Sequence, residues 1–251
     1  PVAFAFGGEA DVVAYARAVA DGALLALMAT LGLLLLGHET TPELAQLTCA
    51  ALALWGMAAA PFRQWRPRLA LVLSLPLLAA SGAPFIAVAI GAVTTLIAMR
   101  SHYESVRAAI PWIAAATLGA VAVGSVLGQW HWRYGVTFEA TEALSAVRML
   151  VWFLWPSWLL ALWTVWRWRR QVLHRHIALP LSIAMVVLLS SLVMNGSQRA
   201  LLLSLPAWAV LAAFALPTLK RSTGAAIDWF SMFLFSALAA FIWLAFTSIH
   251  T

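Results

Sequence analysis

The stretch ALLLSLPAWAVLAAFALP, residues 200–217, has no charged side chain and decides the fold class. A bilayer core of roughly 30 Å needs about 20 apolar residues in a helix that rises 1.5 Å per residue. Inside hydrocarbon every backbone N–H and C=O must be paired, so only helices or a closed barrel can cross it. Because the stretch lacks the two-residue alternation of a barrel strand, it predicts a membrane-spanning helix.

Similar apolar runs extend along the whole chain. They occupy residues 19–37, 42–60, 69–80, 85–99, 110–128, 147–166, 177–194, 200–217 and 229–248. The third and fourth runs are short, and the sequence SGAP between them contains Gly and Pro, which favour a break. We therefore expect 1–251 to form one all-α domain, a polytopic transmembrane helical bundle. It would have about eight or nine apolar helices, with a short broken hairpin near 69–99.

The composition excludes a water-soluble fold. The chain is 64% hydrophobic and 10% charged, with a mean hydropathy of +0.92, whereas soluble domains carry about 25% charged residues. The formal net charge of +6 could suggest nucleic-acid binding, but the basic residues lie between apolar runs and only Lys220 is a lysine. They indicate membrane topology instead, so the bilayer is the expected partner and nucleic acid is not.

Basic residues follow every second apolar run. They are Arg63, Arg66 and Arg68, then Arg100 and Arg107, then Arg167, Arg169, Arg170 and Arg175, and finally Lys220 and Arg221. Loops rich in Lys and Arg stay in the cytoplasm. The connections near 38–41, 81–84, 129–146 and 195–199 are then predicted to face outward.

The longest outward connection holds the largest group of polar side chains. It contains His131, Arg133, Tyr134, Glu139 and Glu142 within the sequence GQWHWRYGVTFEATEALSAVR. A guanidinium can form paired hydrogen bonds with phosphate, while carboxylates and a phenol can bind sugar hydroxyls. The group predicts recognition of a phosphosugar; an ordinary solvated loop is the alternative.

Four further residues could have functional roles. Asp21 lies in an apolar run, where an ionised side chain is costly, so it is either functional or an acid at a helix N-terminus. Arg199, at the outer mouth of the eighth run, could bind a lipid phosphate or be a plain interfacial arginine. His38 and Glu39 could contribute to a divalent-metal site, but a third ligand is not evident. The chain contains no Walker, Rossmann, HExxH or GxSxG motif.

Three stretches resemble a known family in their order and spacing. ARAVADGALLAL at 16–27 is similar to its Arg-x-x-x-x-Asp-Ala-Leu-Leu helix start, and SQRALLLSLPAWAVLAAFALP at 197–217 to its Arg-x-x-Leu-Leu-x-x-x-Pro segment. LPLLAASGAPFIAV at 75–88 occupies the place of its Leu-x-Lys-Gly-Pro hairpin. The family is the GT-C superfamily of polyprenyl-phosphate-dependent membrane glycosyltransferases, in the branch of bacterial aminoarabinose transferases and protein O-mannosyltransferases. HETTPELAQL at 38–47 and AAIDWFSMFLF at 225–235 further resemble a proteobacterial subgroup.

The resemblance implies a multi-pass protein of the bacterial inner membrane. It would transfer a sugar from an undecaprenyl-phosphate donor to a lipid, glycan or protein acceptor on the periplasmic side. By matching positions, the resemblance implies that Asp21 is a secondary catalytic acid. It also implies that Arg199 and Gln198 bind the donor phosphate. The hairpin lysine of the family is replaced, since residues 81–84 read SGAP.

The family's main catalytic Asp lies in a first periplasmic loop that would precede residue 1. We therefore expect this chain to be a fragment that lacks the loop and is inactive alone. Two other classes remain open: a transporter or flippase of lipid-linked intermediates, and a non-catalytic membrane subunit.

Overall fold

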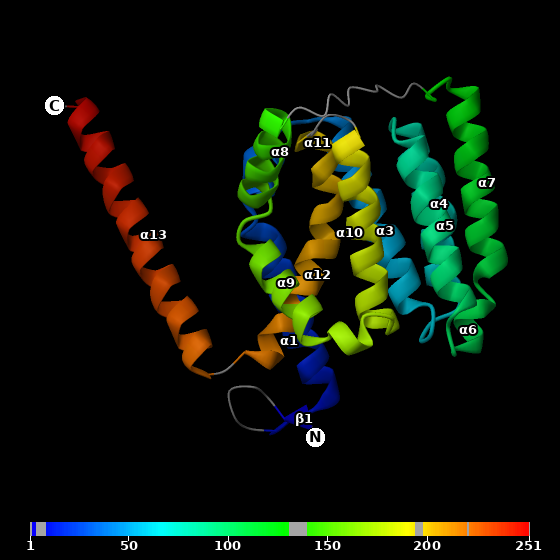
Figure 1. Ribbon diagram of the computed structural model, residues 1–251, viewed down its shortest axis with the longest axis horizontal. Helices are drawn as coiled ribbons and strands as arrows, with labels where there is room; N and C mark the ends of the chain where they lie inside the picture. Colours follow the sequence, from blue (N-terminus) through cyan, green and yellow to red (C-terminus); the bar gives the residue numbers. More distant parts are fainter. Residues whose placement is uncertain (1, 4–8, 131–139, 194–197, 220, 251) are drawn as a thin grey trace.

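The computed structural model describes residues 2–3, 9–130, 140–193, 198–219 and 221–250 (Figure 1). Strands β1 (Val2–Ala3) and β2 (Glu9–Ala10) pair antiparallel over two residues each. All other regular structure in the described residues is helical. The predicted all-α class is confirmed.

Each apolar run is helical over most of its length, although several helices begin before the run. In chain order they are α1 (Val12–Met28), α2 (Leu31–Leu36), α3 (Pro42–Ala59), α4 (Trp65–Ala80), α5 (Pro84–Met99), α6 (Glu104–Arg107), α7 (Ile110–Val126), α8 (Ala140–Phe153), α9 (Ser157–Arg167), α10 (Arg175–Val193), α11 (Gln198–Leu201), α12 (Leu205–Ala215) and α13 (Arg221–His250). Three short 3-10 helices join them, η1 (Arg169–Gln171), η2 (Leu202–Ser204) and η3 (Leu216–Thr218). The expected hairpin near 69–99 is present as α4 and α5, which are broken at the SGAP turn.

Four helical stretches of the described chain are long and apolar enough to cross a membrane. They are Glu104–Val126, Arg175–Val193, Arg199–Thr218 and Asp228–Ser248. The bent pair of Val147–Phe153 and Ser157–Arg167 gives a fifth if it forms one span, and Pro84–Met99 is apolar but shorter. The expected total of about eight or nine apolar spans stays a prediction.

The connections between helices gather at two ends of the bundle (Figure 1). One end holds the connections 60–64, 100–103 and 168–174 together with the start of α13, and we call it the Arg-rich end. The turns at 37–41 and 81–83 and the start of α11 lie at the opposite end. This separation matches the alternation of basic loops along the sequence. Which compartment each end faces stays a prediction.

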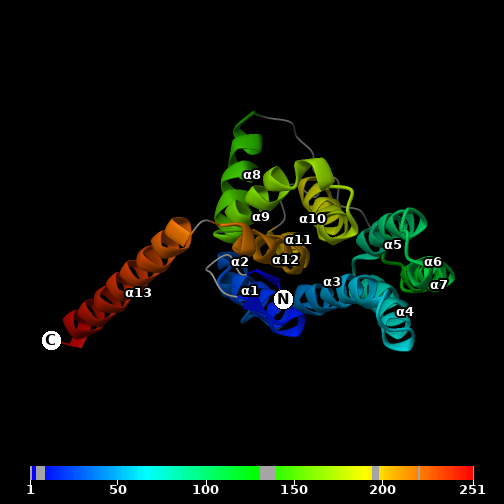
Figure 2. The ribbon, with the colours of Figure 1, turned by 90° about the horizontal axis from the view of Figure 1, so that it is seen from below.

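Helix α12 lies at the centre of one half of the bundle. It packs on α1, α9 and α10, and its Leu205, Trp208 and Leu211 are buried. Helix α10 also packs on α3 and α5, which belong to a second group formed with α4 and α7 (Figure 2). The two groups therefore share α10 as a common element.

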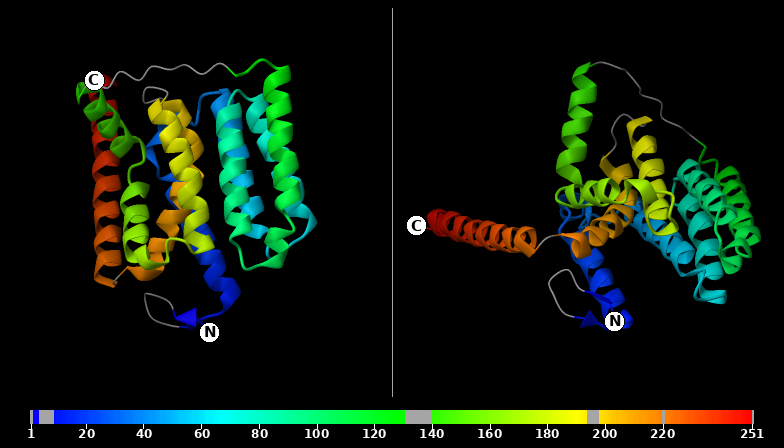
Figure 3. Two further views of the ribbon diagram at one scale, coloured as in Figure 1. Left: turned by 45° about the vertical axis from the view of Figure 1, so that its right-hand side comes forward. Right: turned by 60° about the horizontal axis from the view of Figure 1, so that its bottom comes forward.

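Two apolar runs that we expected to be continuous are interrupted. The run 19–37 is divided between α1 and α2, and the break at Thr30 is followed by a hydrogen bond from Leu31 N–H to Trp155 C=O, 3.0 Å. The run 147–166 bends by 98° between α8 and α9, visible in the right view of Figure 3. Pro156 lies at this bend. Proline has no backbone N–H to donate to the preceding turn, so it interrupts the helix here.

Helix α13 extends away from the rest of the molecule (Figures 1 and 2). No residue between 228 and 248 is buried, and the segment is rich in exposed Phe, Trp and Leu side chains. Such an apolar helix suits a lipid environment, because exposed apolar surface of this size is unfavourable in water.

Candidate functional site

An ion pair joins two distant parts of the sequence at the end opposite the Arg-rich one. Arg199 Nη2 lies 3.3 Å from Glu39 Oε2, which connects α11 to the turn before α3. The Arg199 side chain is 56% exposed and that of Glu39 is 36% exposed. The pair is therefore accessible from outside the bundle, and the guanidinium has donors left for a second anion.

The hairpin turn between α4 and α5 contributes uncharged polar groups at the same end. Buried Gln46 donates from Nε2 to the Ser81 carbonyl, 2.7 Å. Gly82 has φ of +104°, and a Cβ there would lie 3.2 Å from Gln129 Oε1. Glycine thus provides both the backbone conformation and the room for two amide side chains. This turn places polar amide and carbonyl groups at the end that carries Arg199, but none of residues 81–83 is a cation.

Asp21 lies away from this group. Helix α1 begins at Val12 and is capped by Asp11, whose Oδ2 accepts from Val13 N at 3.3 Å. Asp21 is therefore in the helix interior, and the interpretation of Asp21 as an N-terminal acid is wrong. Its side chain is exposed and has no ion pair with another described residue. It lies between the Arg-rich end and the break at Thr30, whereas Arg199 is at the opposite end (Figure 1).

The side chains of the other predicted substrate-binding residues lie outside the part of the chain that the structure describes. His131, Arg133, Tyr134 and Glu139 lie outside the described residues. Glu142 belongs to α8 and Gln198 begins α11, but the structure describes only the backbone of these two residues. Helix α7 ends and α8 begins at the end that carries Arg199 (Figure 1).

Glu39 has a partner other than a metal ion. Its carboxylate faces Arg199, and in the described part of the chain no group of three His, Cys, Asp or Glu side chains could hold a metal. The ion pair was missed at the sequence level because 160 positions separate the two residues. No local pattern indicates a contact over that separation.

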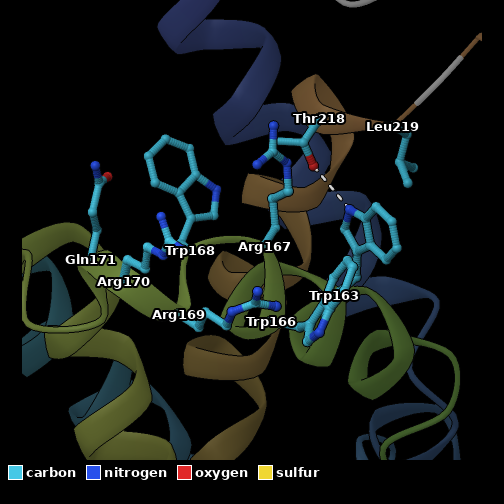
Figure 4. Close-up of a pocket in the computed structure, with 9 residues that line it drawn as sticks. All are labelled: Trp163, Trp166, Arg167, Trp168, Arg169, Arg170, Gln171, Thr218 and Leu219. Carbon is cyan, nitrogen blue, oxygen red and sulfur yellow. Dashed lines mark hydrogen bonds between the residues drawn. The ribbon is translucent and has the colours of Figure 1, made fainter.

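The Arg-rich end contains a cavity of about 980 Å³ beside η1 (Figure 4). Trp163 Nε1 donates to Thr218 Oγ1 at 3.1 Å, which links α9 to η3. The guanidinium of Arg169 lies 5.4 Å from the centre of the Trp166 ring, a cation–π distance. The alternation of Trp and Arg in WRWRR at 166–170 is the sequence signal for this arrangement, in addition to its positive charge.

Comparison with known proteins returns no match. No protein-family model matches the chain, and neither a curated protein nor a solved structure matches it.

Proposed function

We propose that this chain is the membrane part of a glycosyltransferase of the bacterial inner membrane. It would move a sugar from an undecaprenyl-phosphate carrier to a lipid, glycan or protein acceptor at the end that carries Arg199. The observation that supports this best is the exposed Arg199–Glu39 pair, 3.3 Å, at the end opposite the basic loops. Under the positive-inside rule, that end faces the periplasm.

The Arg199–Glu39 pair is suited to reversible binding of a phosphate group. A guanidinium forms paired hydrogen bonds with phosphate oxygens, and these are stronger than bonds between neutral groups. An exposed ion pair is worth only about 0–1 kcal/mol, so a phosphate could compete with Glu39 for Arg199. Glu39 would then keep the guanidinium oriented in the absence of the donor.

The proposed reaction is a direct displacement at C1 of the sugar. A base takes the proton of the acceptor hydroxyl, the hydroxyl oxygen bonds to C1, and the C1–O bond to the carrier phosphate breaks. The phosphate leaves with that electron pair, and the positive charge of Arg199 stabilises it. The resemblance assigns the main base to the first periplasmic loop of the family. Asp21 lies away from Arg199 and takes no part in this step.

A second candidate function is transport or flipping of lipid-linked intermediates. The observation that favours it is a contact between two helix interruptions. The break between α1 and α2 contacts the bend between α8 and α9 through the bond from Leu31 N–H to Trp155 C=O. Interrupted helices are common around transport sites within membranes. Movement of a labelled undecaprenyl-phosphate sugar across proteoliposomes, without transfer to an acceptor, would favour this candidate.

The test uses the intact protein in proteoliposomes with undecaprenyl-phosphate-linked mannose or aminoarabinose. We expect Arg199→Ala to lower the transfer rate at least about tenfold, because a lost charge-assisted bond costs about 1.5–3 kcal/mol. Arg199→Lys should lose less, since it keeps the charge. Arg148→Ala, on α8, is the matched control for removing an exposed arginine and should leave the rate near that of the wild type.

Equal rates for Arg199→Ala and the wild type would contradict the assignment of Arg199. Absence of transfer with normal binding of the lipid-linked sugar would instead favour a non-catalytic membrane subunit. Binding can be measured separately with labelled undecaprenyl phosphate, so the two results are distinguishable.

A further inference from the structure

A second cavity at the Arg-rich end lies between α5 and α10. Its volume is about 1070 Å³, and it is bounded by the end of α5, the connection 100–103 and the connection that leads into α10. Six of its lining side chains are basic or can donate hydrogen bonds from an imidazole ring: Arg100, Arg170, Arg175, His102, His174 and His176. They come from two segments that are distant in sequence.

The charged side chains that line this cavity are all positive. None of the described residues that line the cavity is Asp or Glu, while each arginine keeps its charge at any physiological pH. The one ion pair between described residues lies at the other end of the bundle. The three arginines therefore have no carboxylate partner in the described chain, and an anion from outside would neutralise them.

Arg175 is the most enclosed of the three arginines. It donates from Nη2 to the carbonyl of Met57, which fixes the side chain against α3. Its Nε is buried and has no hydrogen-bond partner among the described residues. The Arg175 Nε is therefore not a donor to a ligand, and the remaining guanidinium nitrogens carry the positive charge of Arg175 in the cavity lining.

The part of the cavity lining farther along α5 and α10 from the Arg-rich end is apolar. Val93 and Leu96 on α5 face it together with Leu181 and Met185 on α10. Leu96 is 53% exposed and Met185 is 39% exposed, so this wall continues to the outer surface of the apolar helices. A ligand that fits both parts has an anionic head and a hydrocarbon tail.

We propose that this cavity binds an anionic phospholipid. The phosphate head would lie among Arg100, Arg170 and Arg175, and an acyl chain would lie along the apolar wall formed by α5 and α10. Basic residues near the cytoplasmic surface attract anionic lipids, and a cavity between helices adds shape to that attraction. This proposal does not depend on sugar transfer, since it concerns the other end of the molecule.

The experiment measures lipid binding to the purified intact protein. Native mass spectrometry in detergent would follow the retention of phosphatidylglycerol against phosphatidylcholine. We expect Arg100→Gln/Arg170→Gln to weaken phosphatidylglycerol binding about thirtyfold, from about 1 kcal/mol for each arginine. Arg175 is not substituted, because loss of its bond to Met57 would affect folding as well as lipid binding.

The matched control is Arg63→Gln/Arg66→Gln. It removes the same charge from exposed positions at the same end, and neither residue lines the cavity. We expect this control to bind phosphatidylglycerol like the wild type. Equal losses in both double variants would overturn the proposal, because they would show a general surface effect.

Two further outcomes also overturn it. Equal retention of phosphatidylcholine and phosphatidylglycerol would show that the head group is not recognised. Binding of inorganic phosphate at millimolar concentration, without retention of phosphatidylglycerol, would show that the site takes a free anion and not a lipid. Both readouts are independent of the glycosyltransferase assay.

Discussion

The hydroxyls of Thr30 and Ser157 lie 2.8 Å apart, although 127 positions separate them in the sequence. Thr30 stands at the break between α1 and α2, and Ser157 begins α9 after the bend. Both hydroxyl oxygens also lie within hydrogen-bond distance of the Ala26 carbonyl oxygen, Thr30 at 2.7 Å and Ser157 at 3.0 Å. Because each hydroxyl has one hydrogen, one of the two donates to the carbonyl and the other donates either to it or to the first hydroxyl. In an apolar environment a helix break leaves backbone groups without partners, and here side chains of the facing break satisfy them.

Thr30→Val should destabilise the protein by about 1 kcal/mol, because it removes a buried bond between helices while keeping the shape. The thermal midpoint in detergent should fall by about 2–4 °C for a chain of this size. Thr48→Val is the control, since the exposed Thr48 bonds to Leu44 in its own helix, at 3.0 Å, and to no other described residue. Equal midpoints for the two variants would show that the contact between the breaks does not stabilise the fold.

The helices were predictable from the sequence because their signal is local. An uncharged run such as 200–217 identifies a helix without reference to any other part of the chain, and Gly82 with Pro84 marked the hairpin turn. The break at Thr30 was not predictable. Backbone and side-chain groups at the break bond to Trp155 and Ser157, and these contacts depend on the packing of distant segments.

The candidate site was predictable only in part, for the same reason. Arg199 was identified from its place at the mouth of an apolar run, but its partner Glu39 was considered only as a metal ligand. The cavity between α5 and α10 combines Arg100 with Arg175, whose basic clusters were assigned separately to topology. A charge count along the chain cannot show that two clusters share one cavity.

Burial predicts a strong difference between two leucines. Leu211 is fully buried in α12, whereas Leu244 is 61% exposed on α13. Leu211→Ala should lower the free energy of unfolding by about 2–5 kcal/mol, because it removes packed methyl groups and leaves a cavity. Leu244→Ala, the same change on α13, should cost less than about 1 kcal/mol. Unfolding in detergent measures both, and similar losses would show that α13 packs against a partner that its exposed surface does not reveal.

The contact between α5 and α7 depends on a glycine. A Cβ at Gly91 would collide with the side chain of Thr117 on α7. We expect Gly91→Ala to destabilise the protein by about 1–3 kcal/mol through overpacking. Adding Thr117→Ala should restore part of the loss, because the smaller side chain makes room for the new methyl group. Absence of this coupling in a double-mutant cycle would contradict the close approach of the two helices.

The orientation of the bundle can be tested with single cysteines at its two ends. Thr40, in the turn 37–41, and Gln64, in the connection 60–64, are both exposed. The native Cys49 is buried and would be replaced by alanine to give a background without thiols. If the Arg-rich end is cytoplasmic, a membrane-impermeant maleimide should label Thr40→Cys in intact cells and Gln64→Cys only after permeabilisation. The reverse pattern would place Arg199 and Glu39 in the cytoplasm. A periplasmic transfer reaction at that pair would then be impossible, while the lipid site between α5 and α10 would face the outer leaflet.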